Sequence, residues 1–461
     1  MKKSEPLQKL NKWAKVGKVA AIFFTFLLVI IGLAYARTDV GTAAANYDKN
    51  LTAAKAAGLC FTSADVARHY KVPDDENGAL LTGELVKTVE ALNKKYDYST
   101  TISDQDFLVY WKELEPCLPA LRIAVDKPHF IFKRKLNTPW FSTQDTGAIA
   151  TFVSRAMRRV KIAALSGQKE VAFDLLTICT KLAVHLGEEP SIDAVYRRKA
   201  ASGFVEKSIC DLIPRFGKDK EWQSLSLNIL TLLDKPYDLN TAIRCEHWSE
   251  YTAAEILMGH GDTKELGLGN DDAIRPATTL SKFIPRFKAA NISRLNQLNA
   301  ELVAQLPNDL RDLTSTTKAL QDFENKVVDP EILNLSYKFM QDLGSQFSYL
   351  GINLEEDFAK QNTLRQALWL LKSGTDPAKG LPISGRFTRD IGGGKILLDH
   401  MPKGWVVYSV GKNGKDQHTT PPPAYIDDFI VHLTMATVPP ELPMTKTSLK
   451  LREAPKKSSS E

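Results

Sequence analysis

The sequence predicts a mainly α-helical protein with an N-terminal transmembrane helix, an irregular array of helical hairpins and a small C-terminal β unit. Three observations support this fold class: an uncharged apolar run at 19–36, apolar residues at helical spacing through most of 73–375, and short apolar runs separated by Gly and Pro in 376–436. The predicted division is a basic lead at 1–18, the transmembrane helix at 19–36, a linker at 37–72, a helical ectodomain at 73–375, the β unit at 376–436 and a disordered tail at 437–461.

The run Val19–Ala36 contains 18 residues and no charge. A helix of about this length crosses the roughly 30 Å hydrocarbon core of a bilayer. Six lysines precede the run, and Glu5 is the only acid among them. Because positive charge stays on the cytoplasmic side, we expect a single-pass protein of the bacterial inner membrane. Its N-terminus would be cytoplasmic, residues 19–36 would contact lipid, and the bulk of the chain would be extracytoplasmic.

A cleavable signal peptide is the competing interpretation of the same run. Ala34-Tyr35-Ala36 matches a small-x-small cleavage site. However, the apolar run is longer than a usual signal core of about 7–15 residues, and its charged lead is long. These features favour an uncleaved anchor. The longest later apolar stretch, Leu225–Leu233, is interrupted by polar residues and is too short to span.

The charge of the chain argues against a nucleic-acid partner. The formal net charge is +6, and residues 1–18, with six Lys and one Glu, supply +5 of it. The remainder is therefore close to neutral, whereas a nucleic-acid footprint needs clustered excess positive charge. One loop, 127–141, does combine basic and aromatic residues. A single short patch is not enough, and we expect no nucleic-acid binding.

The five cysteines contain no C-x-x-C pair, so zinc-ribbon and thioredoxin-like sites are not predicted. An extracytoplasmic location would allow two disulfides with one thiol left over. Cys179 and Cys210 lie on apolar faces of predicted helices, where small buried hydrophobic side chains are the simpler interpretation. The sequence leaves the pairing open. The cysteines are Cys60, Cys117, Cys179, Cys210 and Cys245.

The clearest helical hairpin lies at 142–187. Apolar residues from Ile149 to Ala163 fall on one helical face, Ser166-Gly167-Gln168 forms a tight turn, and a second amphipathic helix ends at Gly187. The short turn predicts an antiparallel pair. It resembles tetratricopeptide-type repeats, but the full signature and a 34-residue period are missing.

The other elements follow from similar signals. Before the hairpin we expect a linker helix ended by Gly58, a turn at 73–80, a helix at 80–93, and a helix capped by Ser103 and ended by Pro116 or Pro119. After it, helices are predicted at 191–213, 220–234, 237–258, 277–305, 307–326, 330–349 and 355–373, and strands at 387–390, 395–401, 404–411 and 426–433.

Three segments carry a resemblance to known proteins: the turn 73–81, Arg244-Cys245-Glu246, and the stretch from Leu381 through Gly404-Trp405-Val406-Val407-Tyr408 to Asp416. The chain resembles a loose set of uncharacterised bacterial single-pass envelope proteins with a helical ectodomain and a small β cap. The last stretch is similar to the C-terminal β unit of type II secretion pseudopilins. The resemblance implies an architecture and no activity.

The departures from pseudopilins are specific. Residues 19–36 contain no glutamate and Gly17 is followed by Lys18, so the pilin processing site is missing. In pseudopilins the acidic loop after the tyrosine strand can bind calcium. The matching candidates here are Asp416, Asp427 and Asp428, but neighbouring lysines dilute their charge, and a β-turn at 413–414 is the alternative. No metal or cofactor is predicted.

Catalytic chemistry has one candidate location. On the predicted helix 237–258, Glu250 shares a face with Glu246 at i,i+4 spacing and with His247 at i,i+3 spacing. Two carboxylates near a histidine can perform acid–base chemistry. The alternative is a structural charge network in which Arg244 holds Glu246 or an acid on the next helix. No H-E-x-x-H, G-x-S-x-G or phosphate-loop motif occurs.

These observations favour a membrane-anchored extracytoplasmic scaffold or protein-interaction module over an enzyme. Helical arrays present extended surfaces to other proteins, so a protein partner is expected. Two alternatives stay open: a hydrolase-type enzyme built around the helix 237–258, and an accessory subunit of a secretion or pilus-like apparatus.

Overall fold

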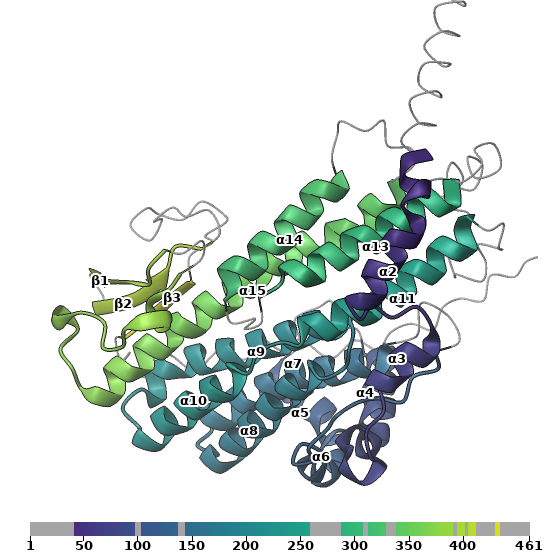
Figure 1. The fold of residues 1–461 in the computed structure, drawn as a ribbon. Helices are drawn as coiled ribbons and strands as arrows, with labels where there is room; N and C mark the ends of the chain where they lie inside the picture. Colours follow the sequence, from purple (N-terminus) through teal and green to yellow (C-terminus); the bar gives the residue numbers. More distant parts are fainter. Residues whose placement is uncertain are drawn as a thin grey trace, which may run out of the picture.

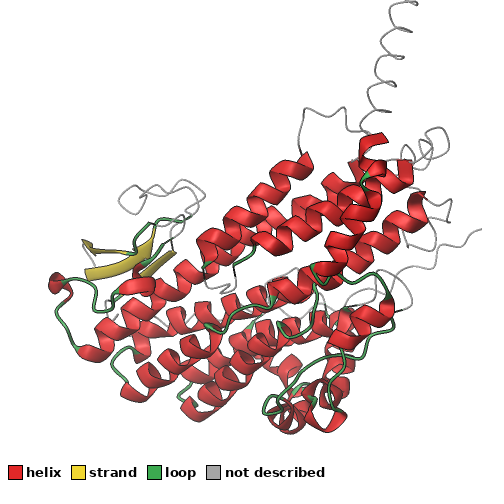
Figure 2. Cartoon of the chain, viewed as in Figure 1, coloured by secondary structure: helices red, strands yellow, loops and turns green. Residues whose placement is uncertain are grey.

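Helices dominate the structure, and a small antiparallel sheet lies near the C-terminus, as the sequence predicts (Figures 1 and 2). The computed structural model describes residues 41–96, 103–136, 143–258, 287–307, 312–328, 338–390, 394–401, 404–411 and 429–433. Among these residues, no helix has the length and apolar character needed to cross a membrane. The predicted span 19–36 and the predicted tail 437–461 lie outside the described residues.

Short helices form the N-terminal part of the described chain. α3 begins with a capping box between Thr62 and Asp65, and α5 begins where the Ser103 side chain accepts from the backbone N–H of Asp106, as predicted. Pro116 and Pro119 lie in the first turn of their helices, where a missing N–H costs nothing. The elements are α2 (Tyr47–Ala56), α3 (Ser63–His69), η1 (Asp74–Glu76), η2 (Gly78–Thr82), α4 (Gly83–Lys95), α5 (Asp104–Lys112), η3 (Glu115–Cys117) and α6 (Leu118–Ala124).

The predicted hairpin is confirmed as α7 (Gln144–Leu165) and α8 (Lys169–Leu186), which pack along each other (Figure 1). Gly167 joins them with a φ of 81°, a conformation that favours glycine. α9 (Ile192–Phe216) and α10 (Lys220–Leu233) complete this layer. The predicted apolar faces are buried in one large core, which includes Cys179.

A second core joins the remaining long helices. α11 (Leu239–Met258), α13 (Phe287–Gln305) and α14 (Leu313–Val328) contribute to it, and α2 packs against α13 (Figure 1). α15 (Lys338–Ser373) runs from α14 past α9 and α10 to the sheet. It therefore connects both cores.

The predicted break between helices at 349 and 355 is wrong, because α15 is continuous through it. Gly351 is the helix-weakening residue at this point. A Cβ built on Gly351 would lie 3.0 Å from the Cα of Thr317 on α14. The glycine therefore permits a close approach of two helices and does not end one.

The sheet has the order β1-β2-β3, with both pairs antiparallel. Its strands are β1 (Leu397–Met401), β2 (Gly404–Ser409) and β3 (Phe429–His432), and Val407 is opposite Val431. The sheet packs against α15, so its buried valines extend the large core.

The predicted strand 387–390 is wrong. The short helix η6 (Gly385–Thr388), which follows η5 (Pro377–Lys379), takes up the first two of these residues, and Arg389 forms only an isolated antiparallel bridge with Lys395. Side chains of α15 satisfy its backbone: Asn362 donates to the carbonyls of Arg386 and Arg389 at 3.2 and 3.0 Å. These tertiary hydrogen bonds, together with the single bridge to Lys395, satisfy the backbone of the segment without a full strand ladder.

Candidate functional site

Two of the three predicted catalytic candidates meet a second helix inside the protein. The Asn299 side chain of α13 donates to His247 Nδ1 at 2.9 Å and to Glu250 Oε2 at 2.6 Å. His247 is 0% exposed and Glu250 is 5% exposed. The buried Asn299 amide thus connects the side chains of His247 and Glu250. The three residues form a compact hydrogen-bond network between α11 and α13.

The surroundings of this network suppress charge. Burial lowers the pKa of His247 to about 3, so the imidazole is neutral. Burial also raises the pKa of Glu250 to about 8. It raises the pKa of Glu246 to about 7, although a hydrogen bond from the Ile192 backbone has a smaller opposing effect. Uncharged groups in a hydrogen-bonded network suit a structural role.

Aromatic side chains close the network from the α2–α3 segment. The ring of Phe61 meets His247 edge-on at a centroid distance of 4.9 Å and Tyr251 at 5.2 Å. Glu246 is not bonded to Asn299, and the Arg244 side chain that was its predicted partner lies against Gly58. The structure therefore brings His247 and Glu250 together through Asn299. Glu246 is outside this hydrogen-bond network, but its charge is near enough to contribute to the raised pKa of Glu250.

A second buried polar cluster, which the sequence did not predict, joins α9 to α15. Glu206 is 1% exposed and accepts from the Gln361 amide at 2.8 Å. Asp357, one turn before Gln361, is 4% exposed and is hydrogen-bonded to Tyr237. Burial raises the pKa of Asp357 to about 7, and burial together with the nearby Asp357 charge raises the pKa of Glu206 well above its usual range.

Arg198 holds the chain beside this cluster. Its guanidinium stacks on the Tyr237 ring at 4.1 Å and donates to the carbonyl oxygens of Leu233, Lys235 and Pro236. The side chain is 2% exposed, and burial lowers its pKa. Arg198 thus positions the α10–α11 connection, which carries Tyr237.

The basic and aromatic loop is largely committed to internal contacts. Phe130 is buried and stacks on His185 at 5.4 Å, and Arg134 is an internal ion-pair partner of Glu189. Lys133 pairs with Asp74 at 2.7 Å. Residues 137–141 of this loop and the calcium candidates Asp416, Asp427 and Asp428 lie outside the described residues.

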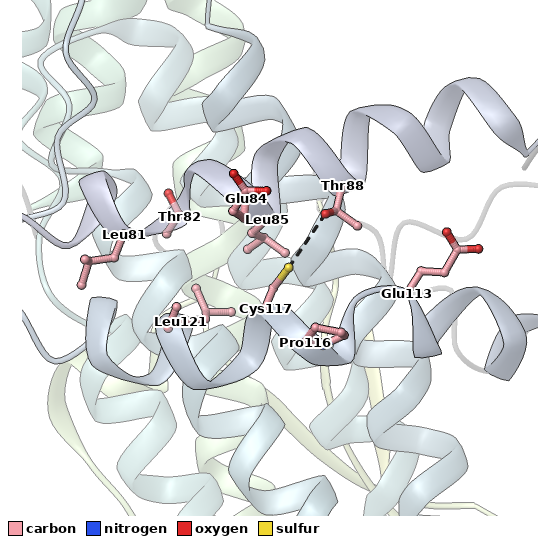
Figure 3. A pocket seen from close by; sticks show the side chains of 10 residues that line it. Leu81, Thr82, Glu84, Leu85, Thr88, Glu113, Pro116, Cys117 and Leu121 are labelled. Carbon is pink, nitrogen blue, oxygen red and sulfur yellow. Dashed lines mark hydrogen bonds between the residues drawn. The ribbon is translucent and has the colours of Figure 1, made fainter.

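The surface offers an accessible hollow on the side of α4 (Figure 3). We call it the α4–α6 groove, because it lies between α4 and the η3–α6 segment. Its volume is about 370 Å³. Neither this hollow nor two others described on α6 and α15 is lined by Glu246, His247 or Glu250. The lining residues are Leu81, Thr82, Glu84, Leu85, Thr88, Glu113, Pro116, Cys117, Ala120 and Leu121.

The groove combines an apolar floor with a neutralised polar rim. Figure 3 shows Leu85, Cys117 and Leu121 between the two helical segments. On the rim, the carboxylates of Glu84 and Glu113 pair with Lys87 at 2.8 Å and with Lys95 at 2.9 Å. The groove therefore suits an apolar group more than an ion.

The resemblance to single-pass envelope proteins and to the pseudopilin β unit stays a prediction, because comparisons with known proteins do not test it. No protein-family model, no curated protein and no solved structure matches the chain.

Proposed function

We propose that the chain is a membrane-anchored extracytoplasmic scaffold that binds an amphipathic segment of a partner protein in the α4–α6 groove. The observation that carries the proposal is the hollow of about 370 Å³, whose lining includes the buried Leu85 and Leu121 and the exposed Leu81. Leu81 in the lining is 43% exposed, its chain neighbour Leu80 is 41% exposed, and Ile123, two residues after the lining residue Leu121, is 59% exposed. Grouped exposed apolar side chains around a concave surface are typical of protein-binding sites.

The charges of the groove favour one kind of partner. Because each rim carboxylate already has a lysine counter-charge, the groove has no unbalanced charge to attract an ion. An amphipathic helix that inserts one or two apolar side chains would cover the exposed Leu81 and leave its polar face to the rim. The membrane anchor rests on the apolar run 19–36 and its preceding lysines.

The α11 network supports the scaffold over the hydrolase alternative. His247 and Glu250 are buried and hydrogen-bonded to Asn299. A catalytic acid or base must reach a substrate proton within hydrogen-bond distance. A side chain enclosed between two helices and capped by Phe61 does not offer that access.

In-cell photo-crosslinking tests the proposal. A photoreactive residue at Leu81 should give one discrete adduct, whereas the same residue at Leu232 on α10, which is 44% exposed, should not. The partner is then identified, purified and titrated against the ectodomain. Ala120→Trp, which fills the groove from an exposed position, should weaken binding of that purified partner at least about tenfold, equivalent to 1.4 kcal/mol.

Two outcomes would contradict the scaffold proposal. One is the same adduct from Leu81 and Leu232. The other is unchanged binding of the purified partner by Ala120→Trp when the variant keeps its helical circular dichroism.

A further inference from the structure

Cys60 and Cys245 lie side by side although 185 positions separate them in the sequence. Their sulfur atoms are 4.0 Å apart, and the side chains are 2% and 4% exposed. The backbone N–H of Cys60 donates to the carbonyl oxygen of Arg244 at 3.0 Å. The segment between α2 and α3 is therefore fixed against α11 with both thiols facing one another.

A histidine completes this group from a third position in the chain. His69 is the last residue of α3, which begins at the Thr62–Asp65 capping box. One ring nitrogen of His69 and the two sulfur atoms all lie within 4.8 Å of one another. His69 is exposed, so its ring can rotate toward the sulfur atoms without disturbing a packed core.

The spacing of the sulfur atoms matches two ligands of one metal ion. Zn–S bonds of about 2.3 Å at a tetrahedral angle place two thiolates roughly 3.8 Å apart. A disulfide instead requires about 2.05 Å. We propose that Cys60, His69 and Cys245 form a binding site for one zinc-like divalent cation.

The donor set defines the properties of this site. Two thiolates and one imidazole are soft and borderline ligands, which select Zn²⁺ over Mg²⁺ or Ca²⁺. The carboxylate of nearby Asp65 already accepts from the backbone of Phe61 and from Thr62 and Arg68, so it is not free to ligate. The described residues therefore supply three ligands, and a solvent molecule would complete a four-coordinate site.

Metal binding would join α3 to α11. The three ligands come from the α2–α3 connection, the end of α3 and the middle of α11. An ion held by all three stabilises the folded state, because the unfolded chain has no preformed site. This inference is independent of the α4–α6 groove, since the two sites share no residue.

Cobalt titration of the purified full chain tests the site. The protein is reduced, stripped with a chelator and titrated first with Co²⁺ and then with Zn²⁺. We expect a thiolate-to-cobalt charge-transfer band that saturates at one Co²⁺ per chain and disappears with one equivalent of Zn²⁺. Zinc should also raise the thermal midpoint of unfolding.

Variants assign the ligands. Cys60→Ser and Cys245→Ser should abolish the band, and His69→Ala should weaken Co²⁺ binding at least about tenfold. Cys117→Ser is the matched control, because Cys117 is a half-buried free cysteine near Thr88 in the groove, and it should keep full binding.

The site is refuted if the reduced chain gives no charge-transfer band, or if a Cys60–Cys245 disulfide accounts for both thiols and the reduced protein binds no Co²⁺. If the cysteine variants lose their helical circular dichroism, the Co²⁺ affinity of His69→Ala becomes the deciding measurement, because this variant removes only an exposed ring. Unchanged Co²⁺ affinity in His69→Ala would then overturn the three-ligand site.

Discussion

Arg134 and Glu189 form an ion pair whose side chains are only 3% and 2% exposed. Arg134 comes from the loop before α7, and Glu189 comes from the connection between α8 and α9. Asp145 accepts from the same guanidinium at 2.5 Å, and the Tyr70 hydroxyl donates to Glu189 at 3.2 Å. This cluster joins the end of α3, the region 134–145 and the connection between α8 and α9.

Removal of Arg134 should destabilise the protein strongly. In Arg134→Ala, Glu189 keeps its buried position but loses its counter-charge, which typically costs about 3–5 kcal/mol. The free energy of unfolding from denaturant titration measures the loss. Lys133→Ala is the matched control, because the Lys133–Asp74 pair is 66% exposed on both sides and should matter little. Equal effects of the two variants would show that Arg134 is not a structural centre.

The stability of the α9–α15 contact should fall as pH rises. Burial raises the pKa of Asp357 from 3.8 to about 7, so between about pH 4 and 7 the folded state keeps a proton that the unfolded chain has released. Unfolding therefore becomes easier with increasing pH across this window. The charged or titratable groups that influence Asp357 are Glu206, Tyr237, Lys199, Glu356 and Lys360.

Asp357→Asn should reduce this pH dependence, and the raised pKa values of Glu206, Glu246 and Glu250 account for the remainder. The amide oxygen still accepts from Tyr237 but carries no charge at any pH. At about pH 8 the variant should be more stable than the wild type by roughly 2 kcal/mol or more, and near pH 4 the difference should be small. Thermal melts across this range measure both effects. Asp322→Asn, on the exposed surface of α14, is the control and should keep the wild-type slope. If Asp357→Asn kept the wild-type dependence of stability on pH, Asp357 would not contribute to that dependence.

Asn299 should stabilise the folded state through its hydrogen bonds to His247 and Glu250. Asn299→Ala leaves His247 and Glu250 buried without their shared donor, and an unsatisfied buried polar group costs about 1–3 kcal/mol. Chemical denaturation should show the loss. Gln297→Ala removes an amide on the same helix whose partner Glu301 is partly exposed, and should change stability far less. A neutral Asn299→Ala would show that the network is not structural and would reopen the catalytic interpretation.

Gly78 should not tolerate a side chain. A Cβ built there would lie 2.0 Å from the carbonyl oxygen of Ala124, which is backbone and has little freedom to move. Gly78→Ala should therefore separate η2 from α6 and lower the thermal midpoint by about 1–3 °C, the shift expected for a loss of about 1–2 kcal/mol in a chain of this length. Gly83→Ala is the control, since a Cβ at Gly83 would meet no atom within 4 Å and alanine favours a helix. Similar midpoints for both variants would contradict the close contact.

The fold could be predicted where its signal is local. The α7–α8 hairpin follows from apolar residues at helical spacing and from the glycine turn at Gly167, because helix periodicity is set by neighbouring residues. The errors occur where a distant contact overrides the local signal. Gly351 does not interrupt α15, because it packs against α14. The Asn362 side chain binds the backbone of Arg386, beside the segment 387–390 that the sequence pattern predicts as a strand.

The buried side-chain clusters were harder to predict from the sequence than the helices and strands. Glu250 and His247 could be placed on one helix face, but only packing against α13 shows that Asn299 joins them. The pair Glu206 and Asp357 has no sequence pattern at all, since its members come from helices far apart in the chain. A carboxylate gives no local sign that it will be buried.

Local patterns in the chain were enough to predict the helical class, the α7–α8 hairpin and the C-terminal strands. They also locate the apolar run 19–36 and its basic lead, from which the membrane anchor is predicted. The meeting of distant side chains, Cys60 with Cys245 and Arg134 with Glu189, emerged only from the packed helices. Periodicity reports the environment of one helix, whereas contacts between distant residues depend on how all the helices pack against one another.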